Sequence, residues 1–237
     1  MAASTGAVGD SAAGSGGFES PVYRAAIVDV LAAVGYGEIS AFERLVEDAG
    51  SAPTLADKVA LGSLATLQFS KIDPIVRHLT SLGADPYAAM EPFREPIDTY
   101  HERMAPADWW ESLVKAYVGD ALANDFYREI AGYLDEATRE LVLSTLDDSG
   151  RTAFVVDRVR AGIEADPRIA GRLALWGRRL MGEALIQAQQ VSAERESLTE
   201  LMTGGHLPSL DLTAIAAMFE RITHRHVERM SALGLAH

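Results

Sequence analysis

Polar side chains on helix faces that should be buried are the first candidates for chemistry. The stretch "LATLQFSKIDP" (64–74) has a helical pattern, with Leu67 and Ile72 among its apolar positions. Gln68 and Lys71 lie three residues apart, close to the same face. An unpaired polar group is costly in a core, so this amide and this amine need partners. Whether these two side chains pair with other protein groups or belong to a metal site is the first question that the sequence raises.

Asp120 is a carboxylate on the apolar stripe of a helix predicted over about 109–134. Tyr117, Ala123 and Tyr127 share its spacing of three and four residues. A buried carboxylate requires a partner, because burial penalises its charged form. The pattern leaves two interpretations open: a hydrogen bond or salt bridge within the core, and a metal ligand.

Glu183 is a second carboxylate at helical spacing from apolar residues, in "LWGRRLMGEALIQAQQV" (175–191). Gly177 and Gly182 weaken a helix, which indicates that another helix packs closely there. Arg179, four residues earlier, offers a surface ion pair as the simpler interpretation of Glu183.

His226 lies on the apolar stripe of the last predicted helix, about 211–233, after Phe219 and Ile222. A core histidine with a hydrogen-bonded partner and a metal ligand both fit that position. Glycine-rich phosphate loops, HExxH and GxSxG are missing from the sequence. The chain has no cysteine, which excludes disulfides, thiolate metal sites and cysteine nucleophiles.

Composition restricts the classes of partner. The net charge of −13 argues against general nucleic-acid binding, which needs an excess of Lys and Arg. No apolar run approaches the roughly 20 residues of a membrane span, so no membrane is expected. Residues 1–19 are rich in Ala, Gly and Ser and lack the pattern of a secretory signal. We expect a disordered tail there and a cytoplasmic protein.

The rest of the chain, 20–237, predicts one all-α domain: a four-helix bundle with additional short helices. "GYG" is predicted to end a first helix and "EPFREP" to form a loop. The expected helices cover about 21–35, 38–50, 54–82, 109–134, 136–147, 151–165, 167–201 and 211–233. Within the third of these, Pro74 should produce a kink.

The order of these segments resembles the ferritin-like superfamily. The resemblance rests on "FERLVEDA", "LGSLATLQFSKIDPIVRHLTSLGADPYAAM", "ESLVKAYVGDALANDFYREIAGYL" and "LALWGRRLMGEALIQAQ", and covers roughly 38–190. It is similar to the branch that contains bacterial tRNA hydroxylases and related uncharacterised proteins. Active members hold two irons with one Glu from each of two helices and Glu-x-x-His from each of the others.

Carried over position by position, the resemblance implies an incomplete di-iron site. Gln68 and Lys71 would occupy one Glu-x-x-His motif, and Asp120 a Glu position. Glu183 and Ile186 would occupy the second Glu-x-x-His motif. For the first bundle helix, Glu43 and Glu47 are the candidates, and neither is secure.

Two hypotheses follow. In the first, a Lys71–Asp120–Glu183 network with Gln68 replaces the metal, no cofactor is bound, and the protein is a non-enzymatic binding or scaffold module. A homodimer formed through a long helix and an unknown protein partner are then expected. The alternative for Lys71 is that its side chain snorkels outward from the bundle and meets neither carboxylate.

In the second hypothesis, the protein is an iron-dependent hydroxylase or oxygenase that resembles the tRNA hydroxylases. Asp120 and Glu183, with Glu43, Glu47 or His226, would hold iron or manganese.

Overall fold

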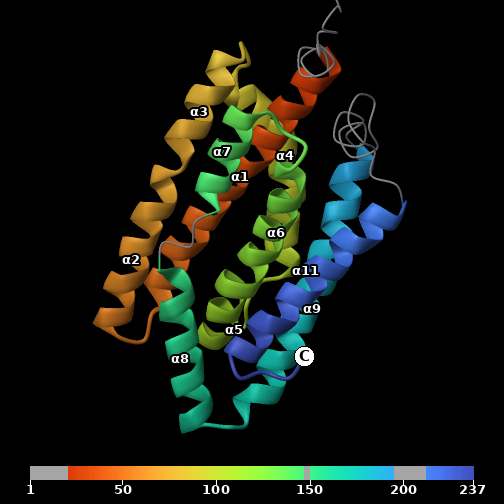
Figure 1. Ribbon diagram of the computed structural model, residues 1–237. Coiled ribbons are helices and arrows are strands. Elements are labelled where there is room, and N and C mark those ends of the chain that lie inside the picture. Colours follow the sequence, from red (N-terminus) through yellow and green to blue (C-terminus); the bar gives the residue numbers. More distant parts are fainter. Residues whose placement is uncertain (1–20, 147–149, 195–211) are drawn as a thin grey trace, which may run out of the picture.

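The structure is a computed structural model that describes residues 21–146, 150–194 and 212–237. All of the regular structure in those ranges is helical, which confirms the predicted all-α bundle (Figure 1). The elements are α1 (Pro21–Ser51), α2 (Leu55–Ser70), α3 (Ile72–Ser81), α4 (Pro86–Arg103), α5 (Trp109–Val114), the π-helical segment η1 (Lys115–Gly119), α6 (Asp120–Ala131), α7 (Glu136–Thr145), α8 (Arg151–Ala165), α9 (Ile169–Glu194) and α11 (Leu212–Ala232). The tail expected at 1–19 and the end of the helix expected to reach residue 201 lie outside the described residues.

The first helix is longer than its sequence predicted. α1 runs through "GYG" without a break, so the predicted end near residue 35 is wrong. Glycine at position 35 lets α4 pack closely on α1, because a Cβ there would lie 2.5 Å from the Met90 Cε. By length and composition α1 could cross a membrane, but 56% of its apolar window is buried inside the bundle. The core helix of a soluble protein passes the same test, so α1 is only weak evidence for a membrane span.

The predicted helix over 54–82 is two helices, α2 and α3, which meet at a turn at Lys71. The Thr54 side chain caps α2 by accepting from the backbone N–H of Asp57. Pro74 falls in the first turn of α3, where its missing N–H removes no helical hydrogen bond. The chain therefore breaks three residues before the proline.

α4 is a helix where the sequence predicted a loop at "EPFREP". Asp85 caps it, and Pro92 and Pro96 lie within it. Pro92 is exposed, whereas Met90 and Phe93 are buried against the bundle. Burial of that apolar face outweighs the local cost of proline.

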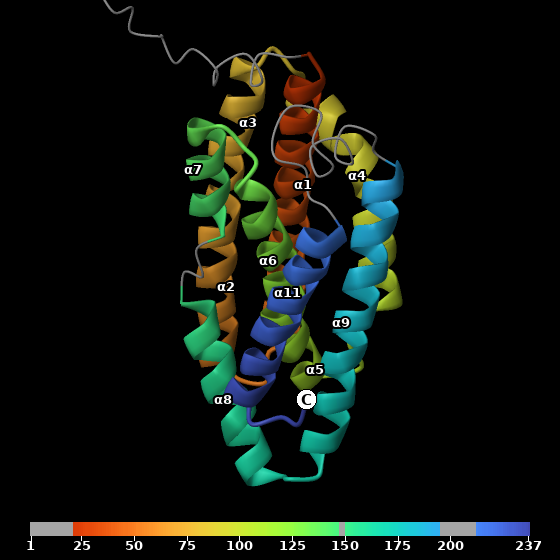
Figure 2. The same cartoon turned by 45° about the vertical axis from the view of Figure 1, so that its right-hand side comes forward.

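The longest helices run along one common axis (Figure 1, Figure 2). α2 and α3 follow one another along one side, and α8 lies at the end that holds the C-terminus. Two large apolar clusters form the core. One combines α1, α3, α4, α6 and α7, and the other combines α5, η1, α6, α8, α9 and α11.

Candidate functional site

A cavity of about 190 Å³ lies between the two apolar clusters. Helices α1, α4, α6, α9 and α11 supply most of its wall, which is largely apolar. Its aliphatic and phenylalanine side chains are Val30, Val34, Phe93, Ile97, Leu122, Phe126, Ile130, Leu185, Phe219 and Ile222. Its ionisable or amide-bearing side chains are Glu38, Gln68, Lys71, Tyr100, His101, Asp120, Asn124, Tyr127, Arg151 and Gln187.

A chain of hydrogen bonds joins four helices at this cavity. The Gln68 amide donates to Glu38 and accepts from Arg151 Nη2, with the last pair 3.1 Å apart. Arg151 Nη1 donates to the Asp120 carboxylate, and the two side chains form an ion pair. Only 8% of the Arg151 side chain is exposed, so the guanidinium is an internal cation of the bundle.

Two local features position this ion pair. Gly150 has a φ of 87°, which glycine adopts readily, and Arg151 follows it as the first residue of α8. Asp120 follows η1, whose five residues are all buried. π-Helical turns shift the register of a helix and are frequent at functional sites. At Gly119 a Cβ would lie 3.3 Å from the Tyr100 hydroxyl, so glycine lets this phenol approach the turn.

Burial dominates the electrostatics of the carboxylates. It raises the pKa of Glu38 to about 7, although the Lys71 and Arg151 charges oppose the shift. Burial also raises the pKa of Asp120 against the opposing charges of Arg151 and Lys115. The Asp120 side chain is 23% exposed, because it borders two hollows and is not surrounded by packed side chains. Near neutral pH, Glu38 is poised between its two protonation states.

The neighbouring bases are also shifted by burial. The pKa of His101 falls to about 3, which keeps this imidazole neutral, and the pKa of Lys115 falls to about 8. Lys115 Nζ donates to the His101 carbonyl oxygen at 3.3 Å. Burial raises the pKa of Tyr100 and Tyr127, so both phenols are neutral.

The structure brings together three of the residues that the sequence singled out. Asp120, Gln68 and Lys71 line the same cavity. Lys71 also lowers the pKa of both Glu38 and Asp120 through its charge. The hydrogen bond to Asp120, however, comes from Arg151, a residue that the sequence did not single out.

Glu183 does not line the cavity. It is half-buried, and its charge contributes to the raised pKa of Tyr100. α9 instead turns Ala184 and Gln187 to the cavity, and Ile186 is 49% exposed. The Glu-x-x-His register carried over to this helix is therefore displaced by one residue.

The weaker candidates lie elsewhere. Glu43 and Glu47 are exposed and form ion pairs with Arg44. His226 is only 5% exposed, and burial lowers its pKa to about 4. It does not line the cavity, and neither ring nitrogen has a hydrogen-bond partner among the described residues.

Glu38 is the carboxylate that α1 brings to the cavity, and the sequence reasoning missed it. Leu31, Val34 and Leu45 are buried at helical spacing from it, a pattern that was readable in the sequence. The predicted break at "GYG" interrupted that stripe and hid the phase of Glu38. Arg151 left no such signal, since it starts a helix remote in sequence from its partners.

Comparison with known proteins identifies the family. The family model described as "Ferritin-like domain, actinomycetes" matches residues 21–205. This chain belongs to that family. No curated protein matches the sequence.

One solved structure that the ferritin-like chain resembles is "Protein 19 with aldehyde deformylating oxidase activity from Synechococcus". The TM-score is 0.68 with 19% sequence identity, over 92% of this chain and 94% of the other. At this identity the likeness supports the shared helical fold.

Proposed function

We propose that this ferritin-like protein is a non-enzymatic binding module. In it, a protein cation replaces the metal centre, and the cavity takes an apolar ligand with an anionic head group. The observation that carries the proposal is the Arg151 guanidinium, which donates to both Asp120 and Gln68 between the helices. A buried carboxylate that is paired with an arginine needs no metal ion to balance its charge.

The donor set supports the absence of a di-iron centre. Such a centre in this fold uses a Glu from each of two helices and Glu-x-x-His from each of two others. Here Glu38 and Asp120 bring two carboxylates to the cavity, while Gln68 and Lys71 bring an amide and an amine. Across the described ranges, no three His, Asp or Glu side chains come close enough together to hold a metal ion. These residues do not fit two irons.

The cavity wall indicates the ligand. Most of it is aliphatic or aromatic, and such walls bind apolar groups while a few polar groups fix orientation. Arg151 and Lys71 supply two positive charges against Asp120 and a half-ionised Glu38. A medium-chain carboxylate combines an apolar tail with a charge that these cations accept.

A second candidate function is a non-haem iron oxygenase with an altered ligand set. Glu38 and Asp120, from two helices, border one cavity, and the similar Synechococcus structure is described by an oxidase activity. A tRNA substrate is disfavoured by the net charge of −13.

Metal content and ligand binding together test the proposal. The purified protein is loaded anaerobically with ferrous iron and desalted, and iron and manganese are counted by plasma mass spectrometry. We expect less than a tenth of an ion per chain. One or two ions per chain would overturn the proposal in favour of the oxygenase.

Calorimetric titration with decanoate tests the ligand. We expect saturable binding, with decanol weaker and acetate undetectable. Ala33→Met places a longer side chain in the cavity wall and should weaken decanoate binding at least tenfold. Ala88→Met, on the exposed face of α4, is the matched control and should bind as the wild type does. Equal decanoate affinity in both variants would place the ligand elsewhere.

A further inference from the structure

A second hollow, of about 160 Å³, lies on another side of Asp120. It is formed by η1, α6, α8 and α11, and the Asp120–Arg151 pair borders both hollows. Three arginines line it: Arg128, Arg151 and Arg229. Asn124 and Thr152 add an amide and a hydroxyl to the wall. The lining therefore combines strong cationic donors with neutral ones.

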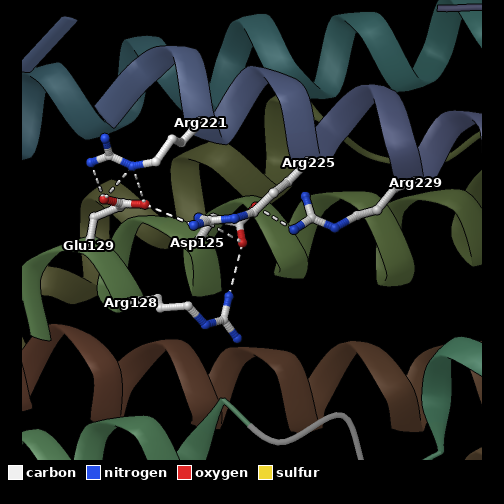
Figure 3. A network of polar contacts seen from close by, with 6 residues as sticks. All are labelled: Asp125, Arg128, Glu129, Arg221, Arg225 and Arg229. Atoms are coloured by element: carbon white, nitrogen blue, oxygen red, sulfur yellow. Dashed lines mark hydrogen bonds and ion pairs between the residues drawn. The ribbon is translucent and has the colours of Figure 1, made fainter. Parts of the chain in front are cut away.

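Two of these arginines, Arg128 and Arg229, belong to a larger cluster between α6 and α11 (Figure 3). Asp125 is fully buried and accepts hydrogen bonds from Arg128 at 3.0 Å and from Arg229. It also pairs with Arg225 at 3.5 Å. Three guanidinium groups thus converge on one carboxylate.

Glu129 is the second acidic member of the cluster. It accepts from Arg225 at 3.0 Å and from Arg221 at 3.1 Å. The six residues in Figure 3 therefore comprise four arginines and two carboxylates, a net charge of +2. The charge of the nearby Asp120 is balanced by Arg151, so this ion pair does not change the net charge of +2.

A local excess of two positive charges is unusual in a chain whose net charge is −13. Arg229 Nη1 is buried and has no hydrogen-bond partner among the described residues. A buried donor without a partner costs free energy, and a bound anion that accepts from it removes this cost. The side chain of Arg128 is 44% exposed, so the hollow can be reached from solvent.

We propose that this hollow is a binding site for a doubly charged oxyanion of the phosphate class. The planar fork of arginine matches the oxygens of phosphate in bidentate geometry. The hollow itself is lined by three arginines and Asp120, a net charge of +2 that a phosphate dianion balances. The hollow shares Asp120, Asn124 and Arg151 with the apolar ligand cavity, but Arg128 lines this hollow and not that cavity, so a variant at Arg128 tests this site apart from the function proposed for the cavity.

Calorimetry with inorganic phosphate at constant ionic strength tests the site. We expect saturable binding of one phosphate per chain and at least tenfold weaker binding of acetate. Arg128→Gln removes a lining cation while Arg225 and Arg229 still satisfy Asp125. It should weaken phosphate binding about tenfold, which corresponds to about 1.4 kcal/mol. Arg168→Gln is the matched control, because Arg168 is exposed and pairs with Asp166 away from the hollow.

A thermal melt guards against a variant that does not fold. Phosphate should raise the Tm of the wild type and of Arg168→Gln, and should have a much smaller effect on Arg128→Gln. Arg128→Lys, which keeps the charge and loses the fork, should bind with intermediate affinity. No phosphate binding by the wild type, or equal losses in the Gln variants, would overturn the proposal. Acetate binding as tightly as phosphate would overturn the assignment to a dianion.

Discussion

Arg151 and Asp120 form an ion pair at the place where the two hollows of the bundle meet. The arginine comes from the start of α8 and the aspartate from the start of α6. Their pairing, with the bond from Arg151 to Gln68, ties a short peripheral helix to the centre of the bundle. The same pair separates an apolar cavity from a basic one.

Removal of Arg151 should destabilise the fold. Arg151→Gln leaves Asp120 without its guanidinium, and breaking a buried pair costs about 3–5 kcal/mol. Burial already raises the pKa of Asp120, and loss of the arginine raises it further. The penalty should therefore fall as pH is lowered from 8 to 5, because protonation of Asp120 removes the charge that the arginine balances. Urea unfolding at both pH values measures it.

The double variant Asp120→Asn/Arg151→Gln provides the control for that pair. It has no carboxylate at position 120 that would be left without a partner. It should therefore recover part of the unfolding free energy that Arg151→Gln loses, and its unfolding free energy should no longer depend on pH through this site. If Arg151→Gln has the same unfolding free energy as the wild type at pH 8, the pair does not hold the bundle together.

Glu38 should make the protein less stable as pH rises toward neutrality. Its pKa is about 7 in the folded state and near 4.5 in the unfolded chain, so the folded state binds the proton more tightly. Its contribution to stability is present below pH 4.5 and is lost as pH rises through 7. The full difference corresponds to about 3 kcal/mol.

Glu38→Gln should therefore be more stable than the wild type at pH 8 and similar to it at pH 4.5. His101 and His226 have lowered pKa values and act in the opposite direction, losing stability as pH falls below 6.5. Their contribution is common to both proteins and cancels in the difference. Glu43→Gln, at an exposed position of α1, is the control and should change nothing. A Glu38→Gln effect that is equal at both pH values would contradict the shifted pKa.

Sequence patterns predicted the helical class and most helix positions. α8 has the predicted bounds of 151–165, because "DDSG" before it and "ADP" after it are strong local signals. α4 was missed because two prolines outweighed the apolar spacing of Met90 and Phe93. Local rules cannot see the tertiary burial that overrides them.

The candidate site was predicted less completely than the fold. Asp120, Gln68 and Lys71 were found, since a polar residue on an apolar stripe is visible in sequence. Arg151 was missed because its partners lie 31 and 83 residues away in the chain. Glu183 was predicted at the site but does not line the cavity, because an error of one residue in helix phase turns a side chain by 100°.

Two glycines in helices should respond oppositely to alanine. At Gly162 a Cβ would lie 2.5 Å from the Trp110 ring, so Gly162→Ala forces the ring or α8 to move. Overpacking of this kind costs about 1–3 kcal/mol. At Gly171 a Cβ meets nothing within 4 Å, and Gly171→Ala should stabilise the protein by about 0.5–1 kcal/mol. Thermal unfolding of the two variants tests this, and a stabilised Gly162→Ala would refute the packing of Trp110 on α8.

Asp125 should be the carboxylate whose loss is most damaging in the cluster between α6 and α11. It is fully buried among three guanidinium groups, and Asp125→Asn leaves them to repel one another. We expect a loss of about 3–5 kcal/mol in unfolding free energy.

Glu228→Gln is the matched control, because Glu228 is exposed beside His224 and should contribute under about 0.5 kcal/mol. High salt should rescue part of the Asp125→Asn loss by screening the arginines. Equal stability of the two variants would show that α11 is held by its apolar face alone.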